Sequence, residues 1–141
     1  MKNKFEFHGK SPEIPAEVLE SLKSEALNGD IDDRDFSVGD INYALRICPH
    51  LNDDGSINIE TAWYKYQQTG EWAVYVNEEL QDKILRVMIF HEIIEIYFRK
   101  KFSMEKTPAH NATLPYEERF KKEVISEAEE EILQELRKSK Y

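Results

Sequence analysis

An apolar helical segment that carries an imidazole and two carboxylates within five residues constrains this chain more than any other feature. Residues 84–98 are mostly aliphatic or aromatic, yet they include His91, Glu92 and Glu95. Because apolar residues fall on every side of the predicted helix rather than along one stripe, we expect the helix to be buried. An unpaired carboxylate in such surroundings is costly, so buried acids are normally hydrogen-bonded, paired with a base or bound to a metal. The segment therefore requires partners for its charged groups.

Length and composition predict one domain spanning residues 1–141. A chain of 141 residues with 40% hydrophobic residues is long enough to form a single core without covalent cross-links. Its one cysteine, Cys48, cannot form an internal disulfide, and no apolar run approaches the ~20 residues of a membrane-spanning helix. The charged N-terminal residues lack the apolar core of a signal peptide. These features predict a cytoplasmic protein that does not enter a membrane.

The net charge argues against nucleic acid as a partner. The chain has 28 acidic and 19 basic residues, which gives a formal charge of -9. Binding to phosphate backbones needs a basic surface or a clear basic patch. We interpret the short basic runs at residues 99–101 and 121–122 as solvated helix surface.

The first part of the chain predicts one helix and then a strand. A helix is expected over residues 15–28, with Pro15 in its first turn and Gly29 in a left-handed cap after its end. An acidic loop follows at residues 30–35. The Ile, Tyr and Leu content of residues 38–48 then favours a strand.

A β-hairpin is expected in the middle of the chain. A strong turn signal occupies residues 52–55. It precedes two runs, residues 56–68 and 71–76, that are rich in β-branched and aromatic side chains. Gly70 lies between the two runs and favours a turn there.

Helices are expected in the second half. Asn77 is a suitable N-cap for a helix that continues through the charged motif to about Lys100. A loop containing Pro108 and Pro115 then leads to a last helix over residues 116–140. These elements together predict an α+β fold with an N-terminal helix, a small and mostly antiparallel sheet, a buried motif helix and a C-terminal covering helix.

The motif has the spacing of metal ligands. Positions four apart project from one helix face, so His91 and Glu95 can reach one metal ion while Glu92 lies on the adjoining flank. A catalytic zinc usually takes three protein ligands and leaves one position for water. His110 is a candidate for the third ligand, and a later acid, Glu118 or Glu123, is the alternative.

The chain resembles the zincin metallopeptidases in this region. Their active helix carries H-E-x-x-H, and a later segment supplies the third ligand. A strand ending at Asn77, a helix that reaches His91 and Glu92, and the later His110 are similar to the minimal ImmA/IrrE-like and SprT-like zincins. The resemblance covers roughly residues 57–111. Glu95 replaces the usual second histidine, and in this respect the chain looks like small phage and prophage proteins with an H-E-x-x-E helix and a later histidine.

The resemblance implies a zincin-like fold and a zinc-dependent hydrolase with peptidase-type chemistry. One zinc ion per chain is expected, held by His91, Glu95 and His110, with Glu92 as the general base. A peptide or protein is the implied substrate, and an edge strand such as residues 71–76 is expected to hold it in extended form.

Two alternatives remain open from the sequence. A catalytically inactive zincin-like protein, acting as a phage or mobile-element accessory or protein-binding module, would keep the fold without the reaction. In the other alternative, Glu92 and Glu95 need no metal, because helical spacing allows them to pair with basic residues nearby. The candidate bases are Arg86, Arg99 and Lys100. Imidazole and carboxylate ligands would also accept manganese, iron or nickel.

Overall fold

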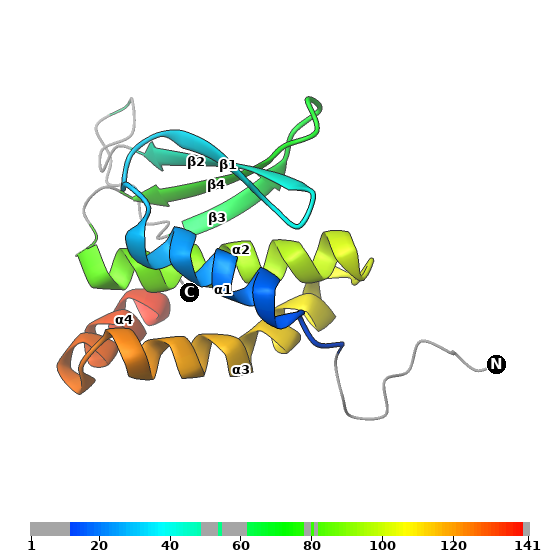
Figure 1. The fold of residues 1–141 in the computed structure, drawn as a ribbon. Helices are drawn as coiled ribbons and strands as arrows, with labels where there is room; N and C mark the ends of the chain where they lie inside the picture. Colours follow the sequence, from blue (N-terminus) through cyan, green and yellow to red (C-terminus); the bar gives the residue numbers. More distant parts are fainter. Residues whose placement is uncertain (1–11, 49–53, 55–61, 78–79, 81, 140–141) are drawn as a thin grey trace.

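The structure, a computed structural model, describes residues 12–48, 54, 62–77, 80 and 82–139. Within these ranges the chain is an α+β protein with four helices and one mixed four-stranded sheet (Figure 1). The elements in chain order are α1 (Ala16–Asn28), β1 (Arg34–Val38), β2 (Ile41–Cys48), β3 (Ala62–Tyr66), β4 (Trp72–Asn77), α2 (Asp82–Lys101), α3 (Lys106–Val124) and α4 (Glu127–Ser139).

The sheet has the strand order β1-β2-β4-β3. The β1–β2 and β3–β4 pairs are antiparallel and the β2–β4 pair is parallel. Most of the pairings are therefore antiparallel, as expected, and β3 and β4 form the predicted hairpin over the part that is described. The expectation of an edge strand at residues 71–76 is wrong, because β4 is paired on both sides. The edge strand of this hairpin is β3.

Strand β1 begins at Arg34, so the expected acidic loop at residues 30–35 is confirmed only over residues 30–33. Its residues alternate between partly buried and exposed positions, so Asp35 lies exposed while Phe36 stacks on Tyr43 of β2 with ring centroids 5.0 Å apart. Gly39 and Asp40 both have positive φ, of 59° and 67°, which is the geometry of a tight two-residue hairpin turn. The strand predicted over residues 38–48 corresponds to β2.

Helix α1 confirms the first predicted helix but not its cap. Gly29 has φ -69° and ψ 154°, so it is extended rather than left-handed. A glycine is needed there for a different reason. The guanidinium of Arg34 donates hydrogen bonds to the side chain and the carbonyl of Glu25, and it occupies the space that a Cβ on Gly29 would fill.

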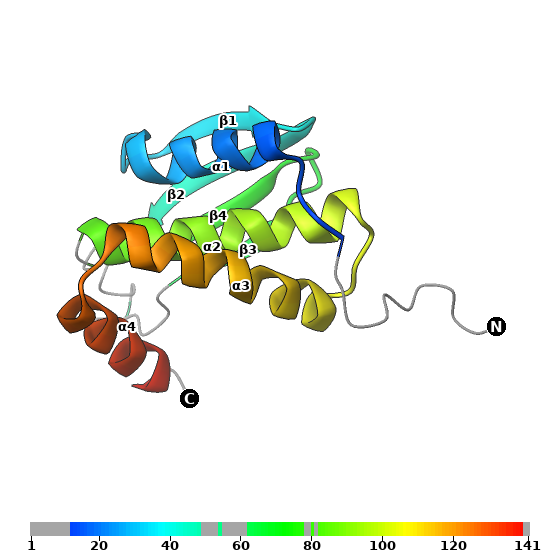
Figure 2. The same ribbon diagram turned by 60° about the horizontal axis from the view of Figure 1, so that its bottom comes forward.

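Helix α2 lies at the centre of the molecule, as its apolar sequence predicted. The sheet and α1 cover one side and α3 packs along the other (Figures 1 and 2). Of its 20 residues, 13 are buried, and these include His91 and Glu95. Leu80 lies outside α2, which begins at Asp82, so this helix starts later than predicted. The predicted first residues 78–79, and the predicted turn and strand at residues 52–53 and 55–61, lie outside the described residues.

Helices α3 and α4 correct the expected loop and single last helix. Both prolines lie within α3. Pro108 is in the first turn, where a backbone N–H has no acceptor inside the helix, while Pro115 is in the interior and exposed. The helix then breaks because Ser126 and Glu129 form a capping box that begins α4, with reciprocal backbone-to-side-chain hydrogen bonds of 2.8 and 3.2 Å.

Across the described helices, none combines the length and the apolar composition that crossing a membrane would require.

Candidate metal centre

The antiparallel pairing of α2 and α3 brings the candidate ligands together. Between Lys101 and Lys106 the chain reverses through a short turn in which Ser103 has φ 54°. Glu95 lies about one and a half turns before the end of α2, and His110 lies about one turn after the start of α3. Residues at similar distances from the turn face each other in such a pair. The histidine expected in a loop therefore projects from a helix.

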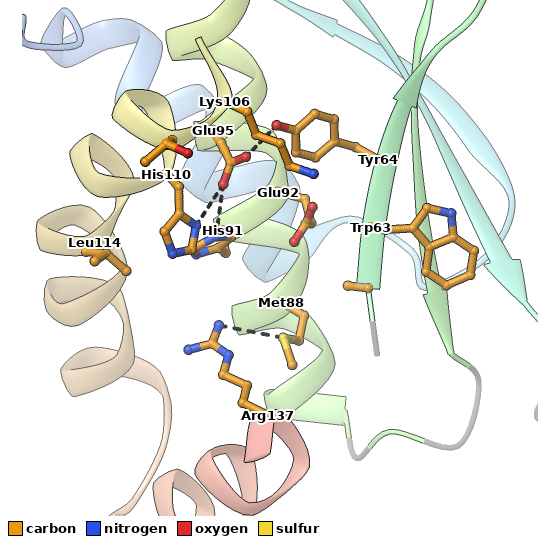
Figure 3. Close-up of a pocket in the computed structure, with 12 residues that line it drawn as sticks. Trp63, Tyr64, Met88, His91, Glu92, Glu95, Lys106, His110, Leu114 and Arg137 are labelled. Carbon is orange, nitrogen blue, oxygen red and sulfur yellow. Dashed lines mark hydrogen bonds and ion pairs between the residues drawn. The ribbon is translucent and has the colours of Figure 1, made fainter. Parts of the chain in front are cut away.

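The three residues predicted as ligands meet at one point (Figure 3). Oε1 of Glu95 lies 3.2 Å from Nε2 of His91 and 3.1 Å from Nδ1 of His110. One donor atom from each residue lies within 4.8 Å of the other two. His91 and Glu95 are buried, whereas the side chain of His110 is 49% exposed. Two imidazole nitrogens and a carboxylate oxygen, open to solvent on the His110 side, are a donor set that fits zinc.

Tyr64 of β3 is a further partner of Glu95 that the sequence did not indicate. Its hydroxyl donates a short hydrogen bond to Oε2 of Glu95, the oxygen that the histidines do not contact. Burial and this hydrogen bond raise the pKa of Tyr64 above its ordinary value, so the hydroxyl stays protonated and can donate. The carboxylate is thereby held with Oε1 toward the two histidines.

Glu117 of α3 contacts His91, the first candidate ligand, at the ring nitrogen that does not face Glu95. Its Oε1 lies 2.7 Å from Nδ1 of His91, and Arg137 of α4 contacts both of its oxygens. A carboxylate on the second ring nitrogen commonly orients a metal-bound histidine. The spacing of α3 held a signal for this residue, because Glu117 continues a buried stripe with Ala109, Thr113 and Phe120.

The buried ionisable groups stabilise one another electrostatically. Burial alone would lower the pKa of His91, but hydrogen bonds with Glu117 and Glu95 raise it to about 9. Burial alone would raise the pKa of Glu117, but its hydrogen bonds with His91 and Arg137 hold the pKa well below its usual range. The cluster is therefore a set of opposite charges rather than a group of neutral side chains.

A pocket of about 470 Å³ opens onto these residues. Residues 62–64 of β3 line one wall, and residues of α2, α3 and α4 line the others. Glu92, the predicted base, is half-buried and lines this pocket together with the three candidate ligands. Lys106, in the first turn of α3, also lines it (Figure 3).

The alternative ligands lie elsewhere. Glu118 pairs with Lys121 at 2.7 Å, and Glu123 pairs with Lys23 at 3.2 Å, and both glutamates are exposed. Among the described residues, the group of donor atoms close enough to share a metal consists of His91, Glu95 and His110.

The alternative in which basic residues neutralise Glu95 does not match the observed contacts. Arg86 binds Asp82 and the backbone carbonyls of Ala26 and Gly29. The guanidinium of Arg99 lies over the rings of Tyr64 and Trp72, and Lys100 is exposed. The Glu95 carboxylate instead contacts His91, His110 and Tyr64.

No protein-family model matches the chain, and neither the curated proteins nor the solved structures that were searched contain a match. Function must therefore be inferred from the residues of the site.

Proposed function

We propose that this protein is a zincin-like, zinc-dependent hydrolase with peptidase-type chemistry. One observation carries the proposal: donor atoms of His91, Glu95 and His110 converge at the wall of a pocket that Glu92 also lines. The succession of a strand, a buried H-E-x-x-E helix and a later histidine supports a zincin-like reading of the α+β fold.

Each residue has a distinct role in this proposal. His91, Glu95 and His110 hold the metal, which supplies Lewis acidity and favours ionisation of water. Glu92 accepts a proton from the attacking water and passes it to the leaving amine as the amide bond breaks. Amide hydrolysis by this route consumes one water and releases a carboxylate and an amine.

The edge strand β3 suits an extended peptide as the substrate. Residues 62–64 line the pocket, and the outer side of β3 has no neighbour within the described sheet. A peptide that adds to a free strand edge forms main-chain hydrogen bonds and places alternate side chains in adjoining pockets. Strand β3 therefore takes the role that we had expected of residues 71–76.

Metal analysis and a turnover assay test the proposal. The wild-type protein should bind about one zinc per chain. His91→Ala should lose the metal, and equal zinc content in both proteins would remove the motif from the site. Glu92→Gln should retain zinc but lose at least a hundredfold in hydrolysis of a fluorogenic peptide library, the lower end of a general base's contribution.

A matched control separates the loss of a base from the loss of a charge. Glu118→Gln removes an exposed acid of α3 that pairs with Lys121, and it should leave both metal and turnover unchanged. Full activity of Glu92→Gln would reject Glu92 as the base. Zinc binding without hydrolysis of any library member would instead favour the inactive protein-binding module.

A further inference from the structure

Arg137 lies near the end of α4, yet its guanidinium reaches Glu117, the residue that contacts Nδ1 of His91. Nη1 and Nη2 donate hydrogen bonds of 2.9 and 2.7 Å to Oε2 and Oε1 of Glu117. Oε1 in turn lies 2.7 Å from Nδ1 of His91. A continuous chain of hydrogen bonds therefore joins α4 to a candidate metal ligand.

The two-point contact restricts the orientation of the Glu117 carboxylate. A guanidinium that binds both oxygens fixes the plane of a carboxylate as well as its position. Glu117 is 2% exposed, so bulk water has little access to replace these bonds. Lys121 offers a competing positive charge 3.6 Å from Oε2. Arg137 thus keeps Oε1 directed at His91.

The orientation of Glu117 determines which nitrogen of His91 is available. A neutral imidazole has one protonated nitrogen and one with a free lone pair. When Nδ1–H donates to Glu117, the lone pair is on Nε2, and Nε2 is the atom that faces Glu95. A metal ligand of this kind depends on the hydrogen bond made by its other nitrogen.

We propose that Arg137 is a positioning residue for the candidate metal centre: by binding both oxygens of Glu117, it holds His91 with Nε2 directed at the metal. This inference rests on the proposed function, because it concerns how the same site is assembled. On this inference α4, which carries none of the three candidate ligands, contributes to the metal centre through Glu117.

Zinc affinity and the absorption spectrum of the cobalt-substituted protein test the inference in the full chain. Arg137→Met should weaken zinc binding about tenfold in competition with a chromogenic chelator, the lower end of the effect of removing such a partner. It should also change the cobalt spectrum, which reports ligand geometry. Arg137→Lys keeps the positive charge but not the two-point contact with the carboxylate. Its zinc affinity should therefore lie between those of Arg137→Met and the wild type.

The control removes an ion pair of α3 that does not involve Glu117. Lys23 of α1 and Glu123 of α3 lie 3.2 Å apart, and Glu123→Gln should keep zinc affinity within about twofold of wild type, because Glu123 is exposed and such surface pairs contribute little. If Arg137 has only a structural role, Arg137→Met should lower the free energy of unfolding without changing the cobalt spectrum.

A double variant keeps the inference testable if Arg137→Met does not fold. Removing both members of a buried pair is milder than removing one. If Arg137 acts through Glu117, the variant Glu117→Gln/Arg137→Met should bind zinc as Glu117→Gln does, because the two effects are coupled. A further loss of affinity from the second substitution would overturn the inference.

The two proposals fail in different ways. Wild-type protein that binds neither zinc nor cobalt would overturn the proposed function and this inference with it. Wild-type binding together with unchanged affinity and spectrum in Arg137→Met would overturn only the role of Arg137.

Discussion

Glu95 is the residue that separates this site from one built on two histidines four positions apart. Its side chain is buried, and burial alone would raise its pKa. Hydrogen bonds with His91, Tyr64 and His110 outweigh that effect and lower the pKa, so the carboxylate remains an anion. An anion with one oxygen toward the histidines can serve as a metal ligand, and its burial is compensated even without the metal.

Tyr64→Phe should weaken the site by releasing Oε2 of Glu95. The substitution leaves a buried oxygen without its donor, which costs about 1–3 kcal/mol in the free energy of unfolding. Zinc affinity should fall about tenfold, as for other partners of metal ligands. Tyr66→Phe is the matched control, since Tyr66 lies on the same strand and is 52% exposed. Equal zinc affinity in the two variants would show that Tyr64 does not orient Glu95.

Zinc binding should strengthen as the pH rises toward 9. The pKa of His91 is about 9, so below that pH the metal must displace a proton, and affinity should rise up to about tenfold per pH unit. In the metal-free protein the stability of the fold changes with pH in the opposite direction. Charged His91 stabilises the fold below the unfolded-state value of 6.5, and this contribution is lost as the pH rises through about 9. Competition titrations from about pH 6 to 9 measure the slope, and a pH-independent affinity would contradict it.

At the scale of elements, the sequence predicted the helices and strands that depend mainly on their own residues. The continuous apolar character of α2 required burial, and β-branched and aromatic residues predicted the β3–β4 hairpin. His91 and Glu95 followed from helical spacing alone. His110 could be suggested only as a later histidine, because its approach depends on the antiparallel return of α3.

The elements that were missed depend on tertiary context. Strand β1 contains exposed Asp35, and its pairing with β2 outweighs the low strand propensity of that residue. Pro108 and Pro115 suggested a loop, although a first-turn proline is compatible with a helix. The edge position of β3 could not be predicted, because it depends on the pairing of β2 with β4. Strand β3 lies between these two strands in the sequence but not in the sheet.

Phe120→Ala should weaken the packing between the two helices that carry the candidate ligands. Phe120 is 1% exposed and stacks on Phe90 of α2, with ring centroids 4.0 Å apart and planes 5° from parallel. Removing the ring should lower the free energy of unfolding by about 3–5 kcal/mol. Zinc affinity should fall as well, because α3 also carries His110. Urea unfolding measures the first effect, and Ile132→Ala, which truncates a 39% exposed side chain of α4, should cost less than about 1 kcal/mol.

At the scale of the whole molecule, the candidate centre joins elements that are distant in the sequence. The candidate ligands come from α2 and α3, while Tyr64 on β3 contacts Glu95 and Arg137 on α4 contacts Glu117. A metal bound there would add a cross-link between α2 and α3 that exists only in the folded state. Ligand binding to the native state alone must then stabilise the entire fold.

Zinc should therefore raise the unfolding temperature in a way that requires His110. At a free zinc concentration 100 times the dissociation constant, the gain is about 2.7 kcal/mol, or roughly 10 °C for a chain of this size. His110 is half-exposed, so His110→Ala should leave the metal-free protein nearly as stable as wild type while removing most of the gain. Asn111→Ala alters the adjacent exposed position of α3 and should keep the gain, and a chelator should reverse it. Equal stabilisation of wild type and His110→Ala by zinc would place the metal elsewhere in the chain, because the loss of a true ligand must reduce the gain.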